Sequence, residues 1–203
     1  RSVLAEMAKV VVERGGEVRT GSRVNVVHVR QHGFVCETPK GVVKGRNIVN
    51  CAGLQCDRVA KMCGMDPGLQ IVPFRGEYYD LVPEKRSLCK NLIYPVPDAR
   101  FPFLGVHFTR GTDNAVEAGP NAVLAWKREG YEKTDVSFED SLEFLTYSGF
   151  WHLAKKHWKM GSYEMKRSLS KSAFVAALAA LIPEIQEEDV EPGRAGVRAQ
   201  AVL

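Results

Sequence analysis

Residues with catalytic chemistry are set into apolar runs between Pro73 and Tyr131. The run Gly105-Val106-His107-Phe108-Thr109 places an imidazole between apolar neighbours, and imidazole exchanges protons near neutral pH. His107 is therefore a candidate general base. The alternative is a histidine hydrogen-bonded in a core or on a sheet surface. A few polar groups placed in an apolar wall are typical of a pocket for a small polar ligand.

Two further side chains suit such a pocket. Arg198 follows Gly196-Val197 near the end of the chain, and a guanidinium can bind a carboxylate through two parallel hydrogen bonds. Arg198 is thus a candidate carboxylate clamp, with a salt bridge to a nearby acid as the alternative. Tyr94 precedes Pro95 and either caps the pocket or packs within the fold.

The elements that must position these residues are read from hydrophobic periodicity. Apolar runs with strand character cover residues 69–82, 91–96, 103–110 and 115–126, and the turn residues 112–114 separate the last two. Together they predict an antiparallel sheet. Helical spacing follows over residues 137–158, where Ser137 and Asp140 resemble a capping box, and over residues 163–181. A final strand begins at Pro192.

The first third of the chain has a different pattern. Residues 2–14 predict a helix, and short strands are predicted at 17–19, 22–30, 33–38 and 42–50. An apolar strand, Asn47–Gly53, then runs directly into a helix over residues 55–63. Its ending in Ala52-Gly53 would let a ligand approach the backbone at a helix N-terminus, or it is a tight turn without a ligand.

A domain boundary is indicated by a short segment of turn-forming residues. Asp66-Pro67-Gly68 breaks the pattern, and no Gly-x-Gly-x-x-Gly motif opens the first region. The sequence therefore predicts an α+β protein. The break separates residues 1–68 from an antiparallel sheet covered by helices over residues 69–192, and residues 193–203 begin a further strand. We expect the chain to be an internal piece of a longer protein.

Composition excludes several classes of function. The net charge of +4 over 203 residues is too mild to indicate nucleic-acid binding. The five cysteines form no CxxC pair, and no His/Cys cluster has metal-ligand spacing, so no metal site is predicted. No run of 18 apolar residues predicts a membrane span. Six Lys or Arg against one acid between His152 and Lys171 indicate a solvated helix face or a patch for anionic lipid or an acidic partner.

Several long motifs carry a resemblance to a known family. Residues from about Val10 to Ala201 resemble the L-2-hydroxyglutarate dehydrogenases, FAD enzymes of the D-amino-acid-oxidase-like superfamily. The motifs that carry it are Pro73-Phe74-Arg75-Gly76, Tyr94-Pro95-Val96-Pro97-Asp98, Phe101-Pro102-Phe103-Leu104-Gly105-Val106-His107-Phe108-Thr109 and Gly119-Pro120-Asn121-Ala122-Val123-Leu124-Ala125.

The resemblance implies FAD as cofactor and oxidation of L-2-hydroxyglutarate, a small dicarboxylic 2-hydroxy acid, to 2-oxoglutarate. It implies that residues 1–68 are part of a Rossmann-like FAD-binding domain without its N-terminal Gly-x-Gly-x-x-Gly unit, that 69–192 form the substrate domain, and that 193–203 begin the return strand to the FAD domain. It implies that His107 takes the hydroxyl proton and Arg198 holds a carboxylate. The unranked candidates for the second carboxylate are Arg75, Lys127, Thr109 and Asn121, and Tyr94 adds a pocket wall. The residues implied to lie beside the flavin are Cys51, Ala52, Gly53 and Gly76.

Alternatives stay open at this point. A related FAD enzyme acting on an amino acid or N-methyl amine would need one carboxylate clamp instead of two. A lipid- or partner-binding module would use the basic segment 152–171. Oxygen, a quinone and an electron-transfer protein are all compatible electron acceptors. The resemblance implies a cytoplasmic protein or one peripheral on the cytoplasmic membrane face in a bacterium, and a mitochondrial one in a eukaryote.

Overall fold

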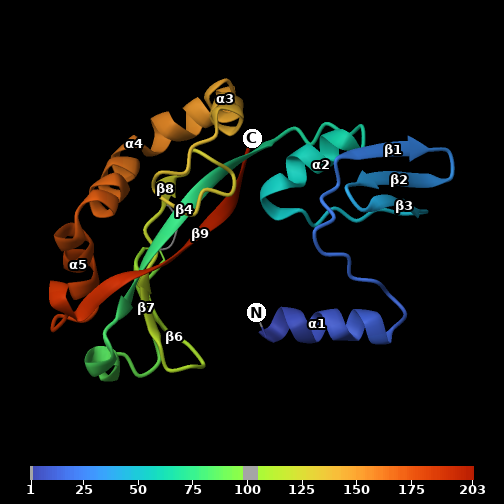
Figure 1. Ribbon diagram of the computed structural model, residues 1–203. Coiled ribbons are helices and arrows are strands. Elements are labelled where there is room, and N and C mark those ends of the chain that lie inside the picture. Colours follow the sequence, from blue (N-terminus) through green and yellow to red (C-terminus); the bar gives the residue numbers. More distant parts are fainter. Residues whose placement is uncertain (1, 98–104) are drawn as a thin grey trace. The chain divides into compact units, whose positions relative to one another are not determined.

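The computed structural model describes residues 2–97 and 105–203, which divide into two compact units (Figure 1). The first unit comprises the described residues up to Cys51 together with Arg58–Asp66. The second comprises Ala52–Asp57 and Pro67–Leu203. Helices and antiparallel strands occur in both units, and this confirms the α+β class.

The first unit contains one helix followed by a small sheet. Helix α1 is Ser2–Glu13, and strands β1 (Val26–Arg30), β2 (Gly33–Thr38) and β3 (Gly41–Gly45) form an antiparallel meander. Part of α2 (Cys56–Met62) also belongs to this unit. The predicted strands at 17–19 and 47–53 are wrong, because no other described segment pairs with those residues as a strand.

The second unit is built on a six-stranded antiparallel sheet with β4 at its centre. Its order is β5-β6-β7-β4-β8, and β9 pairs with β4 from Gln70↔Val202 to Leu81↔Val190. The strands are β4 (Gln70–Leu81), β5 (Leu92–Ile93), β6 (His107–Arg110), β7 (Val116–Gly119), β8 (Val123–Leu124) and β9 (Val190–Val202). The predicted antiparallel sheet is confirmed.

One predicted strand is broken in the structure. Residues 115–126 form β7 and β8, and the chain leaves the sheet between them through the cis Gly119–Pro120 peptide bond. Proline has no N–H to donate to a ladder, so a continuous strand cannot pass through Pro120 in the middle of a sheet. The first part of the predicted strand 103–110 lies outside the described residues.

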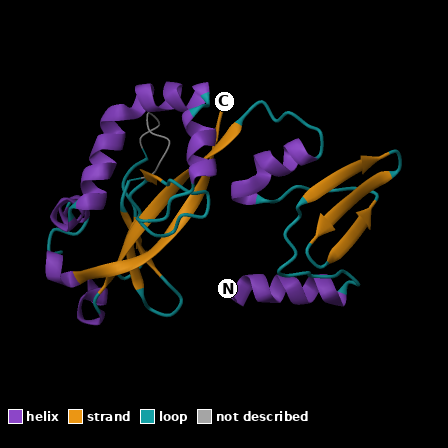
Figure 2. Cartoon of the chain, turned by 45° about the horizontal axis from the view of Figure 1, so that its top comes forward, coloured by secondary structure: helices purple, strands orange, loops and turns teal. Residues whose placement is uncertain are grey.

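Three helices lie along one side of this sheet, as Figures 1 and 2 show. They are α3 (Phe138–Leu145), α4 (Ser148–Leu169) and α5 (Lys171–Ala179), where the sequence predicted two. The Ser137 cap is confirmed, since its hydroxyl accepts the Asp140 N–H. A second serine, Ser170, caps α5 through the Ala173 N–H, so it begins a new helix inside the predicted 163–181 segment.

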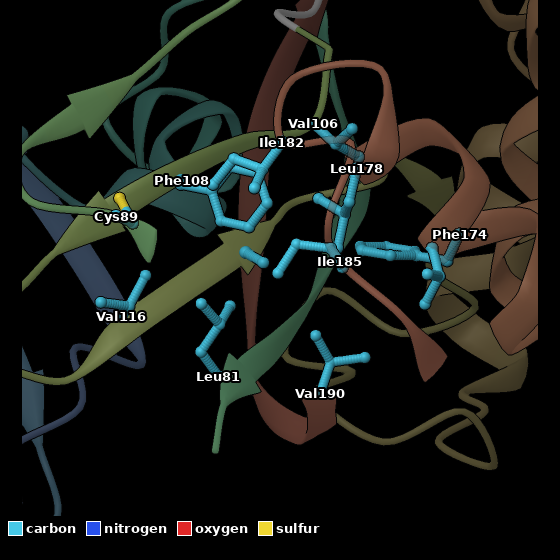
Figure 3. Packing of buried hydrophobic residues seen from close by; sticks show 12 residues of the cluster. Leu81, Cys89, Val106, Phe108, Val116, Phe174, Leu178, Ile182, Ile185 and Val190 are labelled. Carbon is cyan, nitrogen blue, oxygen red and sulfur yellow. The ribbon is translucent and has the colours of Figure 1, made fainter. Parts of the chain in front are cut away.

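The main core lies between the sheet and α5 (Figure 3). Phe108, Ala118 and Leu81 reach it from β6, β7 and β4, and Phe174 and Leu178 reach it from α5, all with no exposed surface. Burying each large apolar side chain stabilises the fold by about 1.5–3 kcal/mol. Because side chains alternate along a strand, the residues between these core positions face away from α5.

A buried ion pair fixes residues 52–57 to the second unit. The Arg128 guanidinium donates to Asp57 Oδ1 at 2.5 Å and Oδ2 at 2.8 Å, and also to Glu143 Oε2 at 2.9 Å. The Arg128 and Asp57 side chains are only 3% and 1% exposed. Asp57 Oδ2 additionally accepts the Ile71 N–H at the start of β4. The bidentate Arg128–Asp57 geometry and the additional hydrogen bonds to both side chains offset the cost of removing the two charges from water.

A second buried network closes the gap between β7 and β8. Asn121 accepts the Glu77 N–H and donates its amide to Glu77 Oε2, both within 2.9 Å. Glu77 Oε1 accepts from Arg75 at 2.8 Å and from Ser168, near the end of α4, at 2.9 Å. Arg75 also donates to the Glu132 carbonyl. The network therefore joins the centre of β4 to the end of α4.

Replacing Arg128 should destabilise the protein strongly. In Arg128→Met the Asp57 carboxylate stays buried without its cation, and breaking a buried pair from one side costs about 3–5 kcal/mol. Urea denaturation followed by tryptophan fluorescence measures the loss. Glu129→Gln, an exposed neighbour, serves as the control and should leave the midpoint in place. A loss below about 1 kcal/mol, typical of surface pairs, would contradict this account.

The Glu77 network predicts a specific pH dependence of stability. Burial acts to raise the pKa of Glu77, but hydrogen bonds from Asn121, Ser168 and Arg75 outweigh it and hold the pKa below its ordinary value of 4.5. The stabilisation is then complete above pH 4.5 and is lost as the pH falls through the folded-state pKa. Wild type should exceed Glu77→Gln in stability at neutral pH, and the difference should shrink in acid.

Unfolding measured between pH 7 and pH 3 checks this. Glu84→Gln, at an exposed site, should show no such pH-dependent difference. A gap between wild type and Glu77→Gln that stays constant across the range would disprove the role given to the ionised Glu77 carboxylate.

Candidate functional site

Four residues form a row across neighbouring strands on the sheet face that points away from α5. His107 of β6 pairs with Gly119 of β7. Continuing the registers of the adjacent pairs by one residue places Tyr94 opposite His107 and Tyr78 opposite Gly119. Residues opposite each other in an antiparallel pair point to the same face. The row therefore runs Tyr94–His107–Gly119–Tyr78.

The side-chain geometry agrees with this register. The rings of Tyr94 and His107 stack, with centroids 4.2 Å apart and planes 18° from parallel. A Cβ built on Gly119 would lie 3.2 Å from Tyr78 Cδ1, so the tyrosine ring leans over the glycine. Gly119 has a φ of 142°, a conformation that residues with a Cβ rarely adopt. A side chain is thus excluded from the middle of the row.

His107 is oriented by its own strand. Its Nδ1 lies 3.0 Å from the Gly105 carbonyl oxygen, and because a carbonyl can only accept, Nδ1 carries the proton. The lone pair of the neutral ring is then on Nε2, the nitrogen that can accept a proton from a ligand. His107 is only partly buried, so this nitrogen is on a face that a ligand can reach.

Thr109 and Tyr94 support that arrangement. The Tyr94 hydroxyl and the Thr109 hydroxyl are 3.2 Å apart, so the tyrosine is held at both its ring and its tip. Of the two readings that the sequence left open for Tyr94, the structure shows packing against His107. Thr109 lies on the same face, two pairs along β6 from His107.

Tyr78 and Glu117 are site residues that sequence reasoning missed. Burial, and next the negative charge of Glu117, raise the pKa of Tyr78 above its ordinary value, while the positive charge of Arg198 acts to lower it. These electrostatic effects show that Tyr78 lies near both charges. The signal in the sequence was alternation along residues 70–81, which puts Tyr78 on the face opposite to the core residues Tyr79 and Leu81.

A cavity of about 200 Å³ adjoins this row and contains Arg198. Arg198 and Gly196 of β9 lie opposite Phe74 and Gly76 of β4, on the face of Tyr78. Gly196 would meet no atom within 4 Å if it carried a Cβ, so the wall there is open. The complete lining is Phe74, Gly76, Tyr78, Pro120, Asn121, Ala122, Gly196, Val197 and Arg198.

The candidates for a second carboxylate clamp fall in different places. The Arg75 guanidinium and the Asn121 amide are already held by Glu77, and Arg75 is 5% exposed and Asn121 1%. Arg75 does not line the cavity, and Asn121 lines it with its side-chain amide already bonded to Glu77. Lys127 is half-buried and sits in the turn closed by the Gly130 N–H and the Lys127 carbonyl, and it does not line the cavity.

Among the residues proposed to lie beside a flavin, some have an accessible backbone and one is a glycine for another reason. Cys51, Ala52 and Gly53 are exposed, and Gly53 has a φ of 53° with no atom within 4 Å of a built Cβ, so its backbone is accessible. Gly76 has a protein neighbour that explains the glycine, because a Cβ there would lie 2.9 Å from Pro120 Cβ. Gly76 nevertheless lines the cavity.

The described residues contain neither a metal-binding cluster nor a membrane-spanning helix. No group of three or more His, Cys, Asp or Glu side chains among them is placed to hold a metal ion. None of their helices has the length and apolarity to cross a lipid bilayer. The motif residues Asp98 and Phe101–Leu104 lie outside the described part of the chain.

Curated relatives carry one name. The chain is 52% identical over 188 residues to the L-2-hydroxyglutarate dehydrogenase of Indibacter alkaliphilus, covering 92% of this chain and 47% of that protein. It is 46% identical over 203 residues to that of Escherichia coli K12, covering 100% and 48%. For the mitochondrial enzyme of Caenorhabditis elegans the identity is 54% over 157 residues, covering 77% and 36%. The chain spans about half the length, or less, of these relatives.

Solved structures agree on the fold. L-alpha-glycerophosphate oxidase from Mycoplasma pneumoniae, solved with FAD bound, matches with a TM-score of 0.64 at 13% identity and covers 96% of this chain and 43% of that one. Glycine oxidase from Geobacillus kaustophilus matches with a TM-score of 0.54 at 17% identity, covering 97% and 41%. At such identities the likeness shows the fold alone.

The family model settles the membership that the motifs indicated. The model described as "FAD dependent oxidoreductase" (DAO) matches residues 1–202. This confirms the predicted superfamily and FAD as the cofactor that it implies. The chain therefore belongs to the DAO family of FAD-dependent oxidoreductases.

Proposed function

We propose that the full-length protein oxidises L-2-hydroxyglutarate to 2-oxoglutarate with FAD as the hydride acceptor. The names of the relatives support this substrate, and they favour a hydroxy acid over the amino-acid or amine alternative. The observation that carries the proposal is the arrangement of His107. Its Nδ1–H is fixed on the Gly105 carbonyl, and its ring lies on the open sheet face that also bears Arg198.

The chemistry assigns each residue a task. Arg198 binds a substrate carboxylate through a charged, bidentate pair of hydrogen bonds. His107 Nε2 accepts the proton of the C2 hydroxyl while the C2–H electron pair leaves as hydride. FAD, when bound, takes that hydride. The hydroxyl carbon becomes the ketone of 2-oxoglutarate, and His107 holds one proton that later returns to water.

Tyr94 acts on the reaction through His107. Its ring covers one face of the imidazole, and its hydroxyl is tied to Thr109. This restricts rotation of the imidazole and keeps Nε2 aimed away from the Gly105 carbonyl. Tyr94 is thus a positioning residue, and its contribution arises from holding the base in a reactive orientation.

A contact with anionic membrane is a further part of the proposal. Helix α4 exposes Trp151 and Trp158, and Lys155, Lys156 and Lys159 lie exposed on the same helix. Aromatic side chains with lysines are typical of helices that lie in a membrane interface. We propose that this helix surface binds anionic headgroups.

Removing the base should slow the chemical step. In the full-length, FAD-loaded protein, His107→Ala should reduce the rate of anaerobic flavin reduction by L-2-hydroxyglutarate by roughly 100-fold or more. Stopped-flow absorbance measures it at saturating substrate. His152→Ala, at an exposed position on α4, is the matched control and should react like wild type. Unchanged kinetics in His107→Ala would remove His107 from the mechanism.

The membrane contact should depend on charge. The full-length protein should co-sediment with vesicles containing anionic lipid and be released as salt is raised from about 0.05 to 0.5 M, because exposed charges are screened. Replacing Lys155, Lys156 and Lys159 by Glu should abolish co-sedimentation. Equal binding to neutral vesicles, or binding by the triple variant, would contradict the proposal.

A further inference from the structure

Tyr78 stands two strands from His107 with a glycine between them. The sheet order places β6, β7 and β4 side by side, and neighbouring strands lie about 4.8 Å apart, so the two strands that carry these side chains are roughly 10 Å apart. Gly119 provides no side chain in that interval. The row thus has an imidazole on one side, a phenol on the other and bare backbone as its floor.

The sheet is also distorted at Tyr78. Between the pairs Glu77↔Ala195 and Tyr79↔Pro192, the register of β4 and β9 shifts by one residue. Two residues of β9 therefore lie opposite the single residue Tyr78, which is a β-bulge. Bulges change the aim of a side chain and are common beside active sites. Here the bulge accompanies a ring that leans over Gly119.

On this face, acidic and basic side chains lie on opposite sides of the row Tyr94–His107–Gly119–Tyr78. Glu117 lies opposite Asp80 in the β4–β7 pairing, and Asp80 is two residues along β4 from Tyr78. Arg198 lies opposite Phe74, on the other side. A carboxylate near Glu117 and Asp80 would be repelled, whereas one near Arg198 would be attracted. An anionic group entering this face is therefore directed to the side where Arg198 and Tyr78 line one cavity.

The protonation state of the Tyr78 phenol allows it to donate a hydrogen bond. Burial, with the charge of Glu117, raises its pKa, so the phenol stays protonated at neutral pH. It has an O–H to donate and no negative charge to repel an anion. Two other hydroxyls on this face, those of Tyr94 and Thr109, lie within hydrogen-bonding distance of each other and are already committed.

We infer that Tyr78 binds the substrate directly, donating its phenol O–H to the carboxylate that Arg198 holds. This rests on the proposed function for the identity of the substrate, but the contact itself needs only a small carboxylic acid. Arg198 and Tyr78 together form one clamp on the cavity side of the row, and His107 faces the adjoining carbon atom across Gly119. Tyr78 therefore acts on substrate binding more than on proton transfer.

The test compares Tyr78→Phe with Tyr79→Phe in the full-length, FAD-loaded protein. Tyr79 is the matched control, because its ring lies on the opposite face against Phe174 of the core, with centroids 4.8 Å apart. Calorimetric titration measures binding of glutarate, an unreactive diacid. Anaerobic stopped-flow gives the Kd and limiting flavin-reduction rate for L-2-hydroxyglutarate. Thermal melting verifies that both variants fold.

Tyr78→Phe should raise both Kd values about tenfold or more, the usual loss when a hydrogen bond to a charged group is removed. Its limiting reduction rate should fall far less than that of His107→Ala, and Tyr79→Phe should match wild type. Unchanged Kd values in Tyr78→Phe would overturn the inference, and so would a lowered reduction rate with unchanged Kd.

The outcomes separate this inference from the proposed function. If wild type binds glutarate but its flavin is not reduced by L-2-hydroxyglutarate, the proposed function fails. Weaker glutarate binding by Tyr78→Phe would still support the tyrosine contact in that case. If wild type binds neither acid, both the function and the contact are disproved.

Discussion

Strand β4 is hydrogen-bonded along both edges and must serve two different environments through its two faces. Over the 12 residues of Gln70–Leu81, it pairs with β9 on one edge and with β7 and β8 on the other. On the α5 side, alternate residues from Arg75 to Leu81 enter the Glu77 network or the core. The residues between them, Gly76 and Tyr78, face the cavity. Because the alternation is fixed by the backbone, a shift of one residue would exchange core and site.

The two faces also handle charge in different ways. On the helix side, Arg75 and Glu77 neutralise each other and their remaining polar atoms are hydrogen-bonded, which is what burial of charge requires. On the open side, Arg198 and Glu117 are exposed and lie on opposite sides of the row. A ligand that excludes water from this face would strengthen each of its electrostatic contacts. The structure thus places rigid, satisfied charges behind the site and accessible ones within it.

Local patterns in the sequence predicted much of this fold. The antiparallel sheet, the Ser137 cap and the position of His107 in a strand all follow from periodicity and turn chemistry. What failed depends on distant partners. Residues 47–53 are apolar and β-prone, yet a strand needs a neighbour to pair with. Ser170 divides a continuous helical pattern, because its side chain caps the next helix.

The site was predictable in outline and not in its register. Arg75 was a reasonable clamp by residue type, but Glu77 two residues later takes its guanidinium. Asn121 is likewise used to close the sheet between β7 and β8. Tyr78 escaped notice because its importance comes from standing opposite Gly119, and strand pairing cannot be read from one strand alone.

The proposed function assigns this open sheet face to an enzyme that removes hydride from the C2 carbon of one enantiomer of a dicarboxylic hydroxy acid. The most direct measurement is anaerobic flavin absorbance of the full-length, FAD-loaded protein mixed with L- or D-2-hydroxyglutarate. The L isomer should bleach the flavin band and the D isomer should leave it unchanged. A flavin left oxidised by the L isomer, or reduced equally by both, would contradict it.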